Sequence, residues 1–179
     1  MMTALFFSTI EVTRQAFYRN ALSYAIVNLK PIVPGHVLVI PTRPVLRLAD
    51  LSPPELSSLM SAVQHVGKVV EHAYGADGLT IACQDGKAAG QTVPHVHFHL
   101  LPRRLQREPF ANNDEIYPAL EQAEGTLAHD MQSSQVPTAF KPEHTKPQPI
   151  KVDADEDRKP RTMEDMEKEA LWLKTFFAE

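Results

Sequence analysis

A chain of 179 residues is long enough for one ordinary domain whose core needs neither a disulfide framework nor a structural metal. The net charge of -4 excludes broad attraction to nucleic acid or an anionic membrane, so any affinity for phosphate groups must be local. A single cysteine, Cys83, and the absence of a run of roughly 20 apolar residues predict a soluble protein of the cytoplasm or nucleus.

The first forty residues predict β-structure. Short apolar runs at 6–10 and 17–20 flank a polar stretch, and this pattern indicates a first hairpin. Leu22–Leu29 and His36–Pro41 have high β propensity and predict two strands. Two prolines and a glycine between these strands require a turn, so the strands can be neighbours in one sheet.

A long amphipathic helix is predicted next. Ser52 followed by two prolines and Glu55 is a capping box with proline at the first helical position, and Gly75 supplies a stop. Apolar residues recur between these two signals at helical spacing and predict one stripe that packs on a sheet. They are Leu56, Leu59, Met60, Val63, Val66 and Val70.

The second half of the chain divides into three parts. Leu79–Gln84 and Val96–Leu101 predict two more strands, followed at 112–117 by a turn and a short helix, and these complete a domain at 1–122. Residues 123–161 carry many prolines and charges, which predicts a disordered insertion. Residues 162–179 predict a final helix, capped by Thr162, that packs back on the domain because isolated helices of this length are marginal.

The most informative stretch holds three alternating histidines. Successive side chains of a strand point to opposite faces, so an extended backbone over 93–101 separates two sets of residues. One face is expected to carry chemistry and the other to join the core. The first set is His95, His97 and His99, and the second is Val96, Phe98 and Leu100.

Three interpretations of this histidine face are possible. The histidines could share a zinc ion with Asp85 or His36, although the neighbouring amides and hydroxyl suit phosphate better than zinc. One of the three could instead be a packed residue without a role. The third interpretation is nucleophilic attack on phosphorus by a central imidazole whose other ring nitrogen is held by an acceptor. Backbone amides of the turn at 90–92 and the Gln91 side-chain amide would then cradle the phosphate oxygens.

The residues at 95–101 resemble the alternating His-apolar signature of the histidine triad superfamily. Residues 28–39, with Asn28, the two prolines, Gly35 and His36, resemble the usual upstream partner of that signature. The loop from Gln84 to Val93 resembles the fragile histidine triad branch, whose members hydrolyse dinucleoside polyphosphates. The similarity covers about 6–117 and extends to the terminal helix, while 123–162 shows no match.

The resemblance implies a role for each matching residue. His97 would attack the α-phosphorus of diadenosine triphosphate, and the backbone carbonyl of His95 would hold the Nδ1 proton of His97. His99 would contact the phosphate, with His36 behind it. The remaining roles are phosphate-chain ligands, a ribose ligand and apolar contacts to the base. Gln84, Gln91 and Thr92 would bind the phosphate chain, and Asn28 would bind the ribose. Phe7, Ile26 and Leu38 would contact the base.

The same resemblance implies an α+β fold with a five-stranded antiparallel sheet, a long helix and a C-terminal helix. It also implies a homodimer in which the sheets of two chains are continuous. A covalent nucleotidyl-His97 would form and release ADP, and water would then release AMP. Mg²⁺ or Mn²⁺ would arrive on the substrate phosphates and would not be held by the triad. Neither nucleic acid nor a membrane is expected as a partner.

Two departures from the branch and two other functions stay open. Pro94 and Leu29 stand where basic residues are common in the branch, and we expect altered affinity with the chemistry retained. One alternative is an adenosine phosphoramidase or adenylate-conjugate hydrolase that uses the same His97. The other is a module that signals in its nucleotide-bound form through Tyr117 and residues 128–161.

Overall fold

The structure is a computed structural model that describes residues 3–106, 109–135 and 160–177. Five strands form one antiparallel sheet in the order β3-β4-β5-β7-β6, and β1 and β2 form a separate pair. The strands are β1 Phe6–Phe7, β2 Ile10–Glu11, β3 Ala16–Arg19, β4 Ser23–Val27, β5 Val37–Pro41, β6 Gly78–Ala82 and β7 Phe98–Arg103. The helices are α1 Pro53–Tyr74, α2 Ile116–Ser134 and α3 Met163–Lys174. The predicted α+β class with a five-stranded antiparallel sheet is confirmed.

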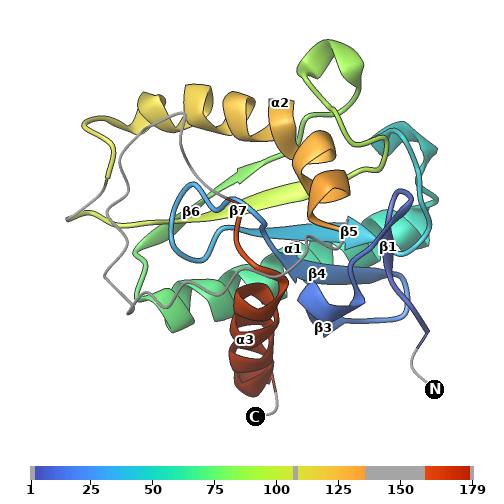
Figure 1. The fold of residues 1–179 in the computed structure, drawn as a ribbon, viewed down its shortest axis with the longest axis horizontal. Coiled ribbons are helices and arrows are strands. Elements are labelled where there is room, and N and C mark those ends of the chain that lie inside the picture. Colours follow the sequence, from blue (N-terminus) through green and yellow to red (C-terminus); the bar gives the residue numbers. More distant parts are fainter. Residues whose placement is uncertain (1–2, 107–108, 136–159, 178–179) are drawn as a thin grey trace.

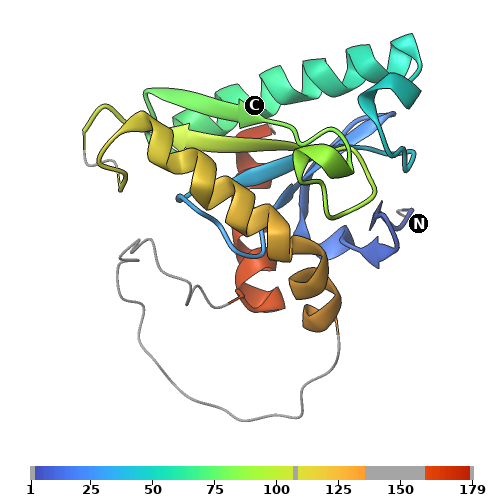
Figure 2. The ribbon, with the colours of Figure 1, turned by 90° about the horizontal axis from the view of Figure 1, so that it is seen from above.

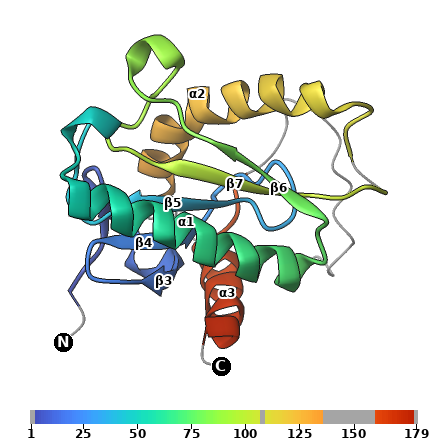
Figure 3. The ribbon, with the colours of Figure 1, turned by 180° about the vertical axis from the view of Figure 1, so that it is seen from behind.

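Helices cover both faces of the sheet. Helix α1 lies across one face, and α2 and α3 lie on the opposite side, as Figures 1, 2 and 3 show from three directions. All residues of β4 and β5 are buried as a consequence. This explains why both strands are almost uninterrupted apolar runs rather than alternating ones, since each of their faces packs against a helix. No helix among the described residues is long and apolar enough to cross a membrane.

Helix α1 agrees with its sequence signals. Ser52 and Glu55 form the reciprocal capping box, and Gly75 ends the helix in the left-handed conformation at φ 60°. The buried stripe contains Leu59, Val63, Val66 and Val70, as predicted, together with Ala62 and Gly67. Leu56 and Met60 were predicted for this stripe, but they are 42% and 44% exposed. These two residues lie on the flank of the stripe that faces away from the sheet.

The predicted first hairpin is wrong. Residues 6–7 pair with 10–11 in a two-residue ladder, and the runs at 6–10 and 17–20 do not pair with each other. Strand β3 pairs instead with β4, with Ala16 opposite Ile26. The physical reason is the sharp turn at Ser8, whose φ is 56°, because it closes the first ladder before the chain can extend to residue 17.

The predicted boundary of the disordered insertion is also wrong. The helix expected at 112–117 to be short continues through α2 to Ser134, so residues 123–134 are helical and packed. Its buried residues are Ile116, Leu120, Glu124, Leu127 and Met131. Of the rest of the predicted insertion, residues 136–159 lie outside the described residues.

Helix α3 docks on the outer part of the sheet, as predicted. The Thr162 side chain accepts a hydrogen bond from the backbone N–H of Asp165, which confirms the predicted cap. Met166, Ala170 and Leu173 are buried against β3 and β4. A polar chain also holds the helix, because Glu169 accepts hydrogen bonds from the Tyr74 hydroxyl and from Arg161.

Candidate active site

The histidines lie where β7 begins next to β5. Strand β7 starts at Phe98, two residues later than predicted, so only His99 belongs to the strand and pairs with Leu38 of β5. His97 lies just before the strand, whereas His95 lies in a bend at 93–95 where its N–H donates to the Val93 carbonyl at 2.8 Å, so the extended backbone predicted over 93–101 is wrong at its start. All three histidines are at most 1% exposed. The centroids of the His97 and His99 rings are 5.1 Å apart, so these two side chains share one site.

His97 is held in one orientation by the backbone of the triad itself. Its Nδ1 donates to the carbonyl oxygen of His95 at 2.8 Å, as the resemblance implied. A carbonyl oxygen can only accept, so Nδ1 carries a proton and Nε2 is the nitrogen directed into the site. A histidine nucleophile requires this arrangement, because one ring nitrogen must be held by an acceptor so that the other nitrogen can attack.

The ring of His95 has a structural position. Its Nδ1 accepts a hydrogen bond from the backbone N–H of Ser8 at 3.0 Å, and its Nε2 donates to the carbonyl of Pro41 at 2.9 Å. Burial lowers the pKa of His95 to about 4, so the ring is neutral at neutral pH. The side chain of His95 therefore fixes the backbone whose carbonyl orients His97.

A chain of hydrogen bonds sets the tautomer of His99. The backbone N–H of Ile32 donates to Nδ1 of His36 at 3.2 Å, so the other ring nitrogen of His36 can donate. That nitrogen, Nε2, lies 2.9 Å from Nδ1 of His99. Nδ1 of His99 is then the acceptor, which leaves a proton on Nε2 facing the site. The predicted place of His36 behind His99 is confirmed by this contact.

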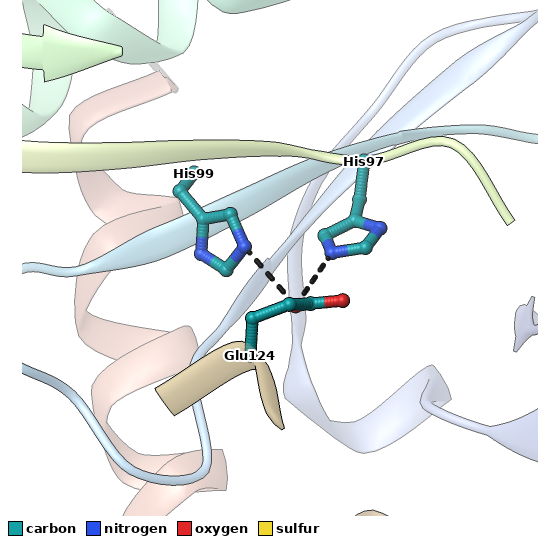
Figure 4. Close-up of side chains that lie close together, drawn as sticks. All are labelled: His97, His99 and Glu124. Atoms are coloured by element: carbon teal, nitrogen blue, oxygen red, sulfur yellow. Dashed lines mark hydrogen bonds and ion pairs between the residues drawn. The ribbon is translucent and has the colours of Figure 1, made fainter. Parts of the chain in front are cut away.

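Sequence reasoning missed one residue of the site, Glu124. Its carboxylate oxygen Oε2 lies 3.0 Å from Nε2 of His97 and 3.4 Å from Nε2 of His99. Figure 4 shows the side chain reaching from α2 to both rings. The other oxygen, Oε1, accepts a hydrogen bond of 2.9 Å from the backbone N–H of Thr92. The available signal was periodicity, because Glu124 shares a helical face with the apolar residues Leu120 and Leu127.

Glu124 is ionised although it is fully buried. Burial alone would raise the pKa of its carboxyl, but the interactions with His97 and His99 and the Thr92 N–H outweigh burial and lower that pKa. A carboxylate accepts hydrogen bonds only, so Nε2 of His97 donates to it. Each ring nitrogen of His97 thus lies within hydrogen-bond distance of an oxygen, Nδ1 of the His95 carbonyl and Nε2 of the Glu124 carboxylate.

The predicted phosphate ligands are placed in three ways. The Gln91 amide is engaged in the glycine loop, since its Oε1 accepts from the Gly86 N–H at 3.0 Å and its Nε2 donates to the Leu46 carbonyl at 3.1 Å. Oε1 of Gln84 is buried without a hydrogen-bond partner in the described part of the chain. Thr92 contacts Glu124 through its N–H and its hydroxyl. Phosphate binding by these residues stays a prediction.

The predicted nucleoside contacts lie close to the histidines and are buried. The ring of Phe7 packs edge-on against His97, with centroids 5.1 Å apart. Ile26 and Leu38 are neighbours across β4 and β5. The Nδ2 atom of Asn28 lies 3.1 Å from Nε2 of His36, so this predicted ribose ligand contacts the histidine chain. None of the four is more than 3% exposed.

His97, His99 and Glu124 also form a group that could hold a metal ion. One ligand atom from each lies within 4.8 Å of the other two. Two imidazole nitrogens and one carboxylate are a donor set that suits zinc, whereas Mg²⁺ prefers oxygen ligands. Of the residues suggested for a zinc shell from the sequence, Asp85 is instead paired with Arg47 at 3.1 Å.

Comparison with known proteins agrees with this geometry. The chain is 49% identical over 179 residues to an asymmetrical bis(5'-nucleosyl)-tetraphosphatase of Schizosaccharomyces pombe, covering 100% of this chain and 97% of the relative. It is 42% identical over 164 residues to a bifunctional bis(5'-adenosyl)-triphosphatase/adenylylsulfatase of Arabidopsis thaliana, covering 92% and 78%. The crystal structure of the C. elegans NitFhit protein aligns with a TM-score of 0.66 and 29% identity, over 98% of this chain and 31% of that one.

The match to a family model covers the sheet and the triad. The HIT domain matches residues 9–106, a range that includes β3 to β7, α1 and all four histidines of the site. Helices α2 and α3 lie beyond the matched residues. The fold, the histidine motif and the relatives lead to one conclusion: the chain belongs to the HIT-domain family.

Proposed function

We propose that this protein hydrolyses dinucleoside polyphosphates, with diadenosine triphosphate as a substrate. The observation that carries the proposal is the Nδ1 bond from His97 to the His95 carbonyl, because it directs Nε2 into a site lined by further hydrogen-bond donors. The names of the relatives from S. pombe and A. thaliana support the same substrate class.

The reaction would proceed in two displacements. Nε2 of His97 attacks the α-phosphorus, an N–P bond forms, and the P–O bond to ADP breaks. Water then attacks the phosphorus, the N–P bond breaks, and AMP leaves with the water oxygen. Nε2–H of His99 and the N–H of Thr92 face the same site, so they can donate to the phosphate oxygens as negative charge develops on them.

A divalent cation would accompany the substrate. We propose that Mg²⁺ or Mn²⁺ binds to the polyphosphate, where it neutralises part of the negative charge on the phosphate oxygens. The histidines would not hold it, because their nitrogen donors suit a softer ion than magnesium. The residues of the site would thus bind and orient a substrate that arrives with its own cation.

Product analysis tests this function directly. With diadenosine triphosphate we expect AMP and ADP in equal amounts, and with the tetraphosphate AMP and ATP, because attack falls on an α-phosphorus in both. Chromatography of the products over time measures this. Two molecules of ADP from the tetraphosphate would place the attack elsewhere and contradict the mechanism. Binding without any turnover would indicate a nucleotide-sensing module instead.

A second candidate activity follows from the Arabidopsis relative, which is named an adenylylsulfatase as well as a triphosphatase. An adenylate conjugate presents the same α-phosphorus to His97 and differs only in its leaving group. Adenylyl sulfate and adenosine phosphoramidate therefore belong in the same assay. Faster turnover of either one than of both dinucleotides would make the conjugate hydrolase the main activity.

We also propose that the protein is a homodimer with a continuous sheet. Strand β6 is an edge of the five-stranded sheet, and the other edge, β3, is covered by α3. Ile81 of β6 is 48% exposed, so the free edge presents an apolar side chain and unpaired backbone groups. A cytoplasmic or nuclear location remains a prediction from the sequence.

Charge at the β6 edge should separate the two subunits. Ile81→Lys is expected to shift the protein from twice the mass of one chain to the mass of one chain, as measured by size-exclusion chromatography with light scattering. Leu105→Lys is the control, since Leu105 is 87% exposed outside the sheet. A wild-type protein that elutes as a single chain would contradict the dimer.

A further inference from the structure

Helix α2 carries one acid in an otherwise apolar buried stripe. The other members of the stripe are Ile116, Leu120, Leu127 and Met131. Glutamate is almost never fully buried unless it is paired, so a glutamate at a core position of a surface helix needs a specific partner. The partners of Glu124 are His97, His99 and Thr92.

These partners are the groups that the proposed reaction needs for phosphate. Nε2 of His97 is the attacking atom, and Nε2 of His99 and the N–H of Thr92 are donors to the phosphate oxygens. A carboxylate and a phosphate accept the same charge-assisted hydrogen bonds, so Glu124 engages Nε2 of His97 and the Thr92 N–H in place of a substrate, while Nε2 of His99 lies 3.4 Å away without a hydrogen-bond partner among the described residues. The carboxylate thus imitates the non-bridging oxygens of the α-phosphate.

The contact also blocks the chemistry. A reacting phosphorus must approach Nε2 of His97 to about 3–3.5 Å. Oε2 of Glu124 already lies 3.0 Å from that nitrogen. Glu124 and the α-phosphate therefore cannot occupy the site together.

Two apolar residues of α2 join the same hydrophobic core as the residues predicted to contact the base. Leu127 and Met131 belong to one buried apolar cluster with Phe7, Ile26 and Leu38. Glu124, Leu127 and Met131 follow one another at spacings of three and four residues, so they lie on a single face of α2.

Helix α2 is itself suited to moving. Its start continues a 3-10 turn at Asn113–Glu115 that the Asn112 side chain caps, and no basic residue lies in its last turn. Gly125 follows Glu124 directly, and a glycine inside a helix costs about 1 kcal/mol relative to alanine. Near its end, Asp130 forms an ion pair of 2.6 Å with Lys30 that ties the helix to the turn after β4. Local packing, rather than intrinsic helix stability, holds α2 in place.

We propose that α2 is an intramolecular substrate mimic, in which Glu124 occupies the α-phosphate site and the helix must withdraw before a dinucleoside polyphosphate binds. This inference rests on the proposed function. It makes the structure a resting form of the enzyme, and it makes substrate affinity depend on the fraction of molecules in which α2 has left the site.

Glu124→Gln tests the mimic by kinetics. The substitution keeps the size of the side chain and removes its charge, so we expect KM for diadenosine triphosphate to fall about tenfold or more with kcat little changed. Glu121→Gln is the matched control, because Glu121 is an exposed acid on the same helix, and its KM should stay near that of wild type. Asp130→Asn loosens α2 without touching the site and should lower KM in the same direction.

Hydrogen exchange of α2 provides a readout that a purely electrostatic effect would not give. With saturating AMP, amides of 116–134 in the wild-type protein should exchange faster, because the nucleotide displaces the helix. In Glu124→Gln they should already exchange fast without AMP. Slower exchange with AMP would make α2 a wall that closes over the nucleotide, and unchanged exchange would mean that an adenylate does not displace it. Either result overturns the proposal.

The same set of proteins distinguishes three further outcomes. A large fall in kcat of Glu124→Gln would make Glu124 part of the reaction and overturn its role as a mimic. If the wild type, stripped with a chelator and then assayed with Mg²⁺ restored, had the KM of the variant, the three groups would hold a cation and the mimic would also be wrong. If no protein cleaved any dinucleotide, the proposed function would fail, while exchange with AMP would still decide whether Glu124 occupies an adenylate site.

Discussion

Replacing His97 with glycine is expected to lower kcat for diadenosine triphosphate by at least about 10⁴-fold, because the variant lacks the atom that forms the covalent bond. The hydrogen bond between His36 and His99 does not depend on the missing ring. The groups that donate hydrogen bonds to the phosphate should therefore remain in place. Dissociation constants should therefore change much less than kcat. Steady-state kinetics and equilibrium binding of the same substrate measure the two quantities.

The control for this variant is His65→Gln. His65 contacts Tyr18 and Phe177 on the outer part of the fold, at ring distances of 5.6 and 5.3 Å, and makes no contact with the histidine site. Its kcat should stay within about twofold of wild type. Substantial turnover by His97→Gly would mean that water attacks the phosphate directly and that His97 serves only to bind it.

Gly35→Ala is expected to destabilise the fold by about 3 kcal/mol, from a left-handed backbone that disfavours a Cβ and from overpacking. Gly35 has a φ of 83°, and a Cβ there would lie 2.6 Å from the Cδ2 atom of Tyr74. The Tyr74 ring cannot easily yield, because its hydroxyl is bonded to Glu169 of α3. Urea unfolding at equilibrium measures the loss of unfolding free energy.

A matched glycine separates these two causes. Gly75 also has a positive φ, 60°, but a Cβ at Gly75 would have nothing within 4 Å. Gly75→Ala should therefore lose only the backbone part, about 1 kcal/mol. Equal losses in the two variants would show that the Tyr74 ring moves aside at no cost, and the steric argument for Gly35 would be wrong.

Local signals were sufficient to predict much of the fold. The capping box at Ser52 and the stop at Gly75 defined α1, because caps act within a few residues of the chain. The apolar runs before and after the turn at 28–36 predicted β4 and β5 for the same reason. Pairing of the residues at 6–20 depended on a turn at Ser8 and on competition with β4, neither of which leaves a local pattern.

The sequence predicted the histidines of the site but not its acidic residue, Glu124. The alternation from His95 to His99 and the resemblance to the triad family identified residues that the structure brings together. Glu124 lies outside that motif, and its meaning depends on a tertiary contact between α2 and the triad. The alanine, leucine, glutamine and glutamate residues around Glu124 favour a helix, but no local signal marks which acid of that helix meets the triad.

The central claim is that His97 forms a covalent bond to the nucleotide, and the mass of the intact protein tests it most directly. Wild-type protein mixed briefly with diadenosine triphosphate and quenched should gain the mass of one adenylate, while His97→Gly treated in the same way should gain none. Rapid cleavage to AMP and ADP with no added mass at any mixing time, together with activity in His97→Gly, would contradict the account.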